Sequence, residues 1–403
     1  MAIDFGIFSS SVLLSARYST GLEIITVPQV LMLLVGLFFL YLAIAKKYEP
    51  LLLLPLAFGI IIANIPLANL SAYDVFESAG QIRPGLMNFM YGGILYVIFP
   101  PLVFLCIGTM TDFAPLISNP KLALIGIGGQ LGIIVAFAIA FFVLGQGAWL
   151  TSIIPGFDGF TPGQAASIGI IGGSDGPTAI FAASRMAPEI LSTVAIAAFS
   201  YMALVPFIQP PIMKWLTTDK ERKVVMPAPK NVTRKQKILF PILGCMAILL
   251  LVPAAGSLVA MFMLGNLLKE SGVTGRYIET LQNALLNILT IFVAISIGSS
   301  ASADKFLTTT TLLVVALGLV AFAFGTIGGV LVAKLLCKIT GGKINPLIGN
   351  SGVSAMPMAA RISQKLGQHY NSQNYLLMHA MGALVSGVVL STVFAGIFIA
   401  FFG

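Results

Sequence analysis

Charged residues are scarce in this chain of 403 residues. Lys, Arg, Asp and Glu make up 9% of it, while 58% is hydrophobic and the mean hydropathy is +0.99. Because a soluble domain carries roughly 25% charged residues, this chain has too little polar surface to cover a fold in water. The scarcity of charge therefore excludes a soluble enzyme and predicts an integral membrane protein.

Cysteine and histidine are almost absent as well. The three cysteines, Cys106, Cys245 and Cys337, lie singly in apolar runs, and His369 and His379 are far from one another along the chain. This spacing predicts neither a disulfide framework nor a site for a soft metal ion. Residues 1–20 lack the basic and apolar regions of a cleavable leader, so we expect the first spanning helix to insert the chain.

Long apolar runs dominate what remains. They are continuous, whereas the strands of a membrane barrel are about 10 residues long and alternate in polarity. The sequence therefore predicts an all-α polytopic membrane protein with about ten spanning helices.

The net charge of +8 is concentrated in loops. Residues 214–237 form a basic linker, whereas residues 145–163 contain no Lys or Arg. By the positive-inside rule, the basic linker is predicted to be cytoplasmic, and residues 145–163 and 69–86 external. The charge thus indicates orientation in a lipid bilayer rather than binding to nucleic acid.

Two stretches interrupt the apolar pattern, at residues 163–187 and 343–365. The first contains GGSDGPTAIF, which sets Asp175 among glycines, Ser174 and Pro177. In a membrane, broken backbone is tolerated only where protein buries it or where it lines a cavity, and an ionisable residue there indicates function. Both stretches are predicted to be re-entrant broken hairpins.

Matching residues suggest that the two halves are related. An offset of 176 residues aligns Gly173 with Gly349, Thr178 with Ser354 and Arg185 with Arg361. We therefore expect an N-terminal segment (1–26), a first repeat (27–213), the linker (214–237) and a second repeat (238–403). Opposite orientation of the halves predicts an inverted-topology repeat with its site near the midplane.

The two hairpins together offer many oxygen ligands and a single carboxylate. Hard cations prefer oxygen, and the unwound backbone of broken helices binds Na⁺ in transporters. The predicted Na⁺ ligands on these grounds are Ser174, Asp175, Thr178, Asn345, Asn350, Ser351 and Ser354.

Simpler roles compete for the same residues. Asp175 could only cap the half-helix that Pro177 begins, and the Ser and Thr hydroxyls could only serve helix packing. Tyr201 could be a packed tyrosine or a proton partner of the site. Arg361 could extend to the membrane interface or receive an anionic group.

Three segments carry a resemblance to a known family. They are GGSDGPTAIF, NPLIGNSGVSAMPMAAR (345–361) and the opening helix pair VLMLLVGLFFLYLAIAKKYEPLLLLPLAFG (30–59). The chain from about Gln29 onward resembles the β subunits of the biotin-dependent, sodium-pumping decarboxylases, which act with oxaloacetate, methylmalonyl-CoA or glutaconyl-CoA. Asn350 and Ser174 depart from this pattern, where smaller residues are expected.

The resemblance implies a specific activity. The subunit would decarboxylate carboxybiotin, couple this reaction to Na⁺ export and consume a proton from the outer side. The family's functional residues match Asp175, Tyr201, Asn345, Gly349, Ser354 and Arg361, with Asp175, Tyr201 and Arg361 catalytic, Arg361 and Asn345 binding carboxybiotin, and Gly349 joining the Na⁺ site.

The resemblance also implies partners and a location. Because no biotinylation lysine in a Met-Lys-Met setting occurs, carboxybiotin would come from a separate carrier and carboxyltransferase subunit. A small membrane γ subunit, a homo-oligomeric arrangement and the bacterial cytoplasmic membrane are expected. The residues alone leave a Na⁺-coupled carboxylate transporter or a structural membrane anchor as alternatives.

Overall fold

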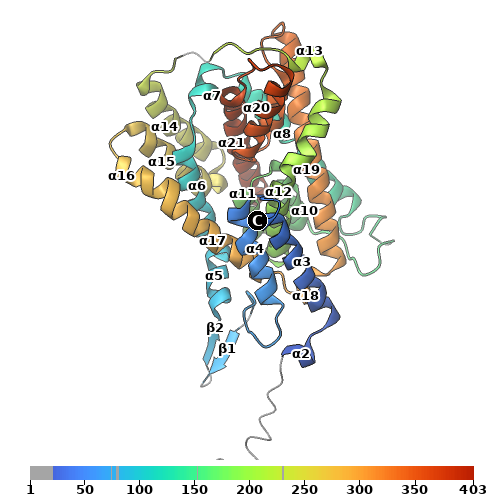
Figure 1. The fold of residues 1–403 in the computed structure, drawn as a ribbon. Helices are drawn as coiled ribbons and strands as arrows, with labels where there is room; N and C mark the ends of the chain where they lie inside the picture. Colours follow the sequence, from blue (N-terminus) through green and yellow to red (C-terminus); the bar gives the residue numbers. More distant parts are fainter. Residues whose placement is uncertain (1–20, 74, 79–80, 152, 229–230) are drawn as a thin grey trace, which may run out of the picture.

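The computed structural model describes residues 21–403, apart from residues 74, 79–80, 152 and 229–230 (Figure 1). Most of the predicted N-terminal segment, residues 1–20, thus lies outside the described residues. The described part of the first half contains α2 (Gly21–Ile24), α3 (Val27–Ile44), α4 (Pro50–Ala63), β1 (Val75–Ser78), β2 (Gln81–Pro84), α5 (Leu86–Leu95), α6 (Phe99–Met110), α7 (Ala114–Ser118), α8 (Leu122–Gly129), α9 (Leu131–Ala138), η2 (Ile139–Val143), α10 (Pro162–Ile170), η3 (Ile171–Gly173), α11 (Gly176–Met186), η4 (Pro188–Ile190) and α12 (Leu191–Leu216).

The linker contains one short helix, α13 (Asp219–Arg222). The second half contains α14 (Arg234–Leu251), η5 (Pro253–Ala255), α15 (Gly256–Ser271), α16 (Gly275–Glu279), η6 (Thr280–Leu285), α17 (Leu286–Ser299), α18 (Ala303–Phe306), α19 (Thr309–Ile339), η7 (Pro346–Gly352), α20 (Met358–Tyr370) and α21 (Leu377–Phe402).

The helical membrane architecture is confirmed. Five helical segments of the described chain are long and apolar enough to cross a bilayer: Val27–Ile44, Leu122–Val143, Gly275–Ser299, Thr309–Ile339 and Leu377–Phe402. Two bent pairs, Leu86–Leu95 with Phe99–Met110 and Pro188–Tyr201 with Leu204–Leu216, raise the number to seven if each counts as one span. The number of ten stays a prediction, since it also requires the shorter or less apolar helices α4, α14 and α15.

One small sheet departs from the all-helical prediction. Strands β1 and β2 pair antiparallel, with Val75 opposite Pro84 and Ser78 opposite Gln81. This hairpin lies at the opposite end of the molecule from α13 and α20 (Figure 1). The predicted external loop and the predicted cytoplasmic linker are therefore at opposite ends.

Both interrupted stretches are broken helices. The first runs as α10, the short 3-10 turn η3, a two-residue break and α11. The second begins with a 3-10 helix, η7, rather than an α-helix, and continues through the non-helical residues 353–357 into α20. Proline stands at the first helical position of both α10 and η7, where its missing N–H costs nothing.

The elements of the two halves do not follow the 176-residue offset. Pro346 begins η7 184 positions after Pro162 begins α10, and α20 begins 182 positions after α11. Helices α12 and α21 both have 26 residues and begin 186 positions apart. The offset that aligns matching residues in the Gly/Ala-rich segments is therefore smaller than the offset that aligns the starts of the helices.

Glycines let helices from the two halves cross closely. A Cβ on Gly298 of α17 would lie 2.1 Å from the carbonyl oxygen of Leu56 in α4. In the same way, a Cβ on Gly108 of α6 would lie 2.1 Å from the carbonyl oxygen of Phe262 in α15. Because helix backbones touch at both crossings, no side chain fits there.

We expect Gly108→Ala to destabilise the protein by about 1–3 kcal/mol, because the added methyl group overlaps a carbonyl that cannot rotate away. Gly244→Ala in α14 is the matched control, since its Cβ would lie 3.6 Å from the flexible end of Met263. Thermal unfolding in detergent measures both. Equal apparent Tm values for the two variants would contradict the close crossing.

Candidate functional site

The first broken stretch turns at Ser174 and Asp175. Ser174 has a φ of 56°, in the left-handed region, and ends η3. Asp175 is extended, with a φ of −121°, and caps α11, whose first turn contains Gly176 and Pro177. This turn points the Asp175 carboxylate into the protein instead of along a continuous helix.

The Asp175 carboxylate is held by hydroxyl groups. It accepts hydrogen bonds from Thr178 Oγ1 at 2.6 Å, from Thr178 N at 3.4 Å and from Ser391 Oγ at 3.5 Å. Its side chain is 6% exposed, and no Lys, Arg or His of the described chain forms an ion pair with it. The predicted capping role is therefore present, but it leaves a buried carboxylate without a protein cation.

The second broken stretch meets the first at this turn. Ser354 N donates to Gly173 O at 2.8 Å, and Ser354 Oγ lies 3.2 Å from Ser391 Oγ. Ser391, on α21, thus contacts both stretches. The hydroxyls of Thr178, Ser354 and Ser391 and the Asp175 carboxylate form one connected cluster.

Two buried oxygens beside this cluster have no hydrogen-bond partner, Gln130 Oε1 and Ser174 Oγ. Gln130 Nε2 donates to the carbonyl oxygens of Gly126 and Gly387, and this fixes Oε1 on the side of Gly173, 3.8 Å from where a Cβ on that glycine would lie. A buried polar atom without a partner needs an explanation. Oxygens of this kind next to a carboxylate suit a small hard cation.

Sequence reasoning missed Gln130 and Ser391. Gln130 had a signal, because it is the one polar side chain between Leu122 and Leu144, and an amide inside a span must find a partner. Ser391 had none, since small hydroxyl residues are common wherever helices pack closely.

Asn350 and Ser351 lie in a second polar cluster. Asn350 Nδ2 donates to Gln209 Oε1 at 2.8 Å and to Ala359 O at 2.9 Å. Asn350 Oδ1 accepts from Ser363 Oγ and from Ser351 Oγ. No hydrogen bond of the described residues joins this cluster to Asp175, and its amide is fully paired within the protein.

Asn345 ties the linker to the start of η7. Its Nδ2 donates to the carbonyl oxygens of Arg222 at 3.0 Å and Val224 at 2.7 Å, and its Oδ1 accepts from Leu347 N at 2.9 Å. The buried Arg222 guanidinium in turn donates to Asp219 and to Tyr370 OH at the end of α20. The hydrogen bonds of Asn345 thus join the linker around α13 to the start of the second broken stretch.

The remaining predicted residues lie apart from the Asp175 carboxylate. Tyr201 is buried on α12 and donates its hydroxyl hydrogen to Val315 O on α19. Arg361 is exposed on the first turn of α20. Gly349 packs against the backbone of α19, where its Cβ would lie 2.5 Å from Gly329 O.

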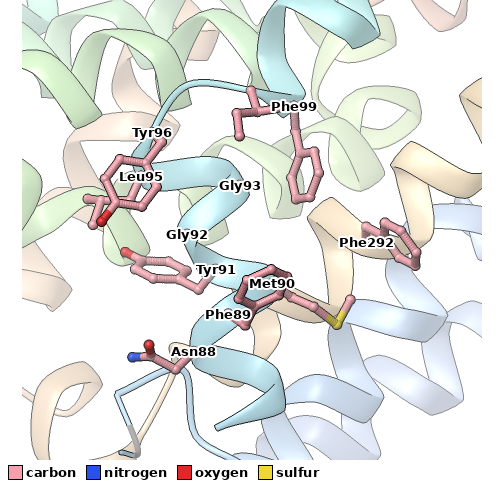
Figure 2. A pocket seen from close by; sticks show the side chains of 11 residues that line it. Asn88, Phe89, Met90, Tyr91, Gly92, Gly93, Leu95, Tyr96, Phe99 and Phe292 are labelled. Atoms are coloured by element: carbon pink, nitrogen blue, oxygen red, sulfur yellow. The ribbon is translucent and has the colours of Figure 1, made fainter. Parts of the chain in front are cut away.

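A large cavity lies outside the residues considered so far. A cavity of about 610 Å³ lies at the bend between α5 and α6, where Gly93 leaves room for the Phe99 ring. Figure 2 shows Tyr91 and Tyr96 on one side of α5 and Phe99 with Phe292 on the other. No charged side chain is among the residues that line it.

No group of three or more His, Cys, Asp or Glu side chains within the described residues could hold a metal ion. The oxygen cluster around Asp175 instead has one formal charge, with hydroxyl and amide oxygens around it, which matches a monovalent hard cation better than a transition metal.

Comparison with known proteins identifies the family of this chain. The family model described as the Na⁺-transporting oxaloacetate decarboxylase beta subunit matches residues 28–402. The methylmalonyl-CoA decarboxylase subunit beta of Propionigenium modestum is 47% identical, over 97% of this chain and 99% of its own length. The glutaconyl-CoA decarboxylase subunit beta of Acidaminococcus fermentans is 49% identical (97% and 98%), and the oxaloacetate decarboxylase beta chain of Klebsiella pneumoniae is 46% identical (94% and 96%). With matches of this length and identity, the chain belongs to the family of Na⁺-transporting decarboxylase β subunits.

Proposed function

We propose that this chain decarboxylates carboxybiotin delivered by a separate carrier subunit, and couples that reaction to Na⁺ export and to the uptake of one proton. The observation that carries the proposal is the buried Asp175 carboxylate, which has hydroxyl partners but no protein cation. A site of this kind must hold either a cation or a proton, and exchange between the two is the basis of coupling.

Na⁺ is the transported substrate, and the cluster fits it. Asp175 supplies the charge, Thr178 and Ser391 supply hydroxyl oxygens, and Gln130 Oε1 and Ser174 Oγ are buried oxygens that no protein donor occupies. The predicted ligand Ser354 reaches the cluster through Ser391. Of the other predicted ligands, Asn350 and Ser351 belong to the second cluster, while Asn345 and Gly349 support the second broken stretch from outside the cluster.

Asp175 would bind Na⁺ and a proton in competition. When the carboxylate takes a proton, the site loses its only formal charge, and the attraction for Na⁺ falls. Moving one charge against 100 mV costs about 2.3 kcal/mol, so release to the outer side has to be tied to protonation. Competition between Na⁺ and a proton for the single carboxylate would couple Na⁺ release to protonation without a second ionisable group.

Arg361 and Tyr201 would serve the decarboxylation itself. Arg361 is exposed on the first turn of α20, and the far end of this helix lies beside α13, from which side a carrier subunit could present an anionic carboxyl group. When the N–C bond of carboxybiotin breaks, CO₂ leaves and the nitrogen takes up one proton. Tyr201, buried on α12, or Asp175 is the proposed relay of that proton, and Asn345, which also holds the linker against η7, is proposed to bind carboxybiotin together with Arg361.

The assembly and topology belong to the same proposal. We infer a carrier and carboxyltransferase subunit, a small membrane γ subunit, a homo-oligomeric complex and the bacterial cytoplasmic membrane, since the bacterial relatives are named as decarboxylase subunits. An inverted-topology repeat is supported by the paired crossings, because α4 packs on α17 in the way that α15 packs on α6. The meeting of the two broken stretches at Gly173 and Ser354 supports it further.

In the complex with its carrier subunit in proteoliposomes, Asp175→Asn should lower both Na⁺-dependent decarboxylation and ²²Na⁺ uptake by at least about a hundredfold, because the amide neither charges nor exchanges a proton. Asp158→Asn is the matched control, since Asp158 is exposed in the predicted external loop. Wild-type rates of both processes in Asp175→Asn would rule out the proposed coupling site.

Ser391→Ala should raise the Na⁺ concentration that gives half-maximal decarboxylation by roughly tenfold, because loss of one hydrogen bond to a charged group costs about 1.5 kcal/mol. The control is Thr392→Val, because the Thr392 hydroxyl donates only to Val389 O in its own helix. Titration of CO₂ release against Na⁺ measures the effect. An unchanged half-saturation in Ser391→Ala would remove Ser391 from the ion site but leave the Asp175 test standing.

A further inference from the structure

A groove between the second half of α12 and α20 is used by none of the chemistry above. It encloses about 550 Å³, and the residues that line it are Pro206, Pro210, Lys214, Ile362, Lys365, Leu366, Gln368 and His369. The prolines on α12 leave a flat wall with no side-chain donor. The floor is apolar, while one end is polar and basic.

The basic end has no protein counter-charge. Lys214 and Lys365 are both exposed, and no acidic side chain is among the residues that line the groove. The nearest acids in sequence are already paired, Asp219 with Arg222 at 2.7 Å and Glu221 with Lys334 at 3.5 Å. Two lysines facing one groove without a carboxylate attract an anion.

A second, apolar cavity lies farther along α12, toward the middle of the helix. It encloses about 290 Å³ between α3, α4 and α12, and the residues that line it are Phe38, Phe39, Leu42, Tyr48, Leu53, Ser200, Leu204 and Phe207. Phe207, 49% exposed, stands between the groove residues Pro206 and Pro210 in sequence, and its ring packs against Tyr48 at 5.0 Å. Moving along α12, a ligand would thus meet two cations first and an apolar surface next.

We propose that these two cavities bind one anionic phospholipid, with its phosphate at Lys214 and Lys365 and an acyl chain over Phe207. Basic pockets between spanning helices at the cytoplasmic side bind anionic headgroups, and the predicted orientation puts Lys214 on that side. Trp215, 76% exposed next to Lys214, suits the headgroup region of a bilayer. The site is separate from the Asp175 cluster, so it does not depend on the proposed function.

A bound lipid would restrain α20, the helix that ends the second broken stretch. Lys365 lies one helical turn after Arg361 on the same face of α20. A headgroup bound at Lys365 would therefore hold the helix whose first turn carries the residue proposed to receive the substrate carboxylate.

The test uses the full-length chain in nanodiscs or detergent, with phosphatidylglycerol and phosphatidylcholine as probes and native mass spectrometry as the readout. Lys214→Gln with Lys365→Gln should weaken phosphatidylglycerol binding roughly thirtyfold, since each lysine near an anionic headgroup contributes about 1 kcal/mol. Binding of phosphatidylcholine should not change. Lys235→Gln with Lys338→Gln removes the same charge from elsewhere and should leave the affinity within about twofold.

A second variant keeps both cations and probes the acyl chain. Phe207→Ala should weaken binding of long-chain phosphatidylglycerol and leave the short-chain dihexanoyl lipid unaffected. Equal affinities of wild type and the Lys214/Lys365 variant, or an equal loss in the control pair, would overturn the proposal.

Three competition results would also overturn it. Displacement of the lipid by millimolar inorganic phosphate alone would make the groove a free-anion site. Displacement by biotin would assign it to the substrate path. A change in oligomeric state, rather than in lipid binding, in the Lys214/Lys365 variant would show that a second copy of the chain occupies the groove.

Discussion

The fold is organised around a carboxylate that cannot stay charged by itself. Transfer of an unpaired carboxylate from water into a protein interior is very costly, and Asp175 is buried with two hydroxyl groups and one backbone N–H as its partners. The folded chain must therefore hold a proton or a cation at this point. That requirement connects the burial of one side chain to the proposed exchange of Na⁺ for a proton.

Close backbone packing makes such burial possible. A Cβ on Gly172 would lie 2.4 Å from the carbonyl carbon of Gly132 on α9, and one on Gly129 would lie 2.1 Å from Gly352 O. Both broken stretches are thus pressed against α8 and α9 with no side chains between. Polar groups at these crossings lie in a medium of low dielectric constant, where electrostatic interactions are stronger than in water.

Much of this arrangement could be predicted from the sequence, because its causes are local. Gly172, Ser174 and Pro177 around a lone Asp175 predict a break with the carboxylate at its turn, and the turn lies where these residues predict it. The place of Gln130 and Ser391 beside the turn could not be predicted, since both residues join the cluster only through the packing of α8 and α21, although Gln130 stands out as a lone amide in an apolar run. The 176-residue register failed for a related reason. Glycine and alanine recur wherever helix backbones touch. Matches between such residues in the two halves therefore reflect close packing, and they do not align the helices of one half with those of the other.

The two broken stretches also differ in what they can bind. Asn350 uses both donors and accepts two hydroxyl hydrogen bonds, so a cation at the second cluster would have to displace bonds that already exist. At the first turn, Gln130 Oε1 and Ser174 Oγ have no such bonds to lose. The loss of hydration that a cation undergoes on entering the protein is offset only by oxygens that can coordinate it. The two halves therefore contribute unequally: the first contains the carboxylate and the two oxygens without a donor, while the second contributes the hydroxyls of Ser354 and Ser391 and a polar cluster that is already internally satisfied. Under the proposed coupling, this second cluster would not retain an ion that leaves when Asp175 is protonated.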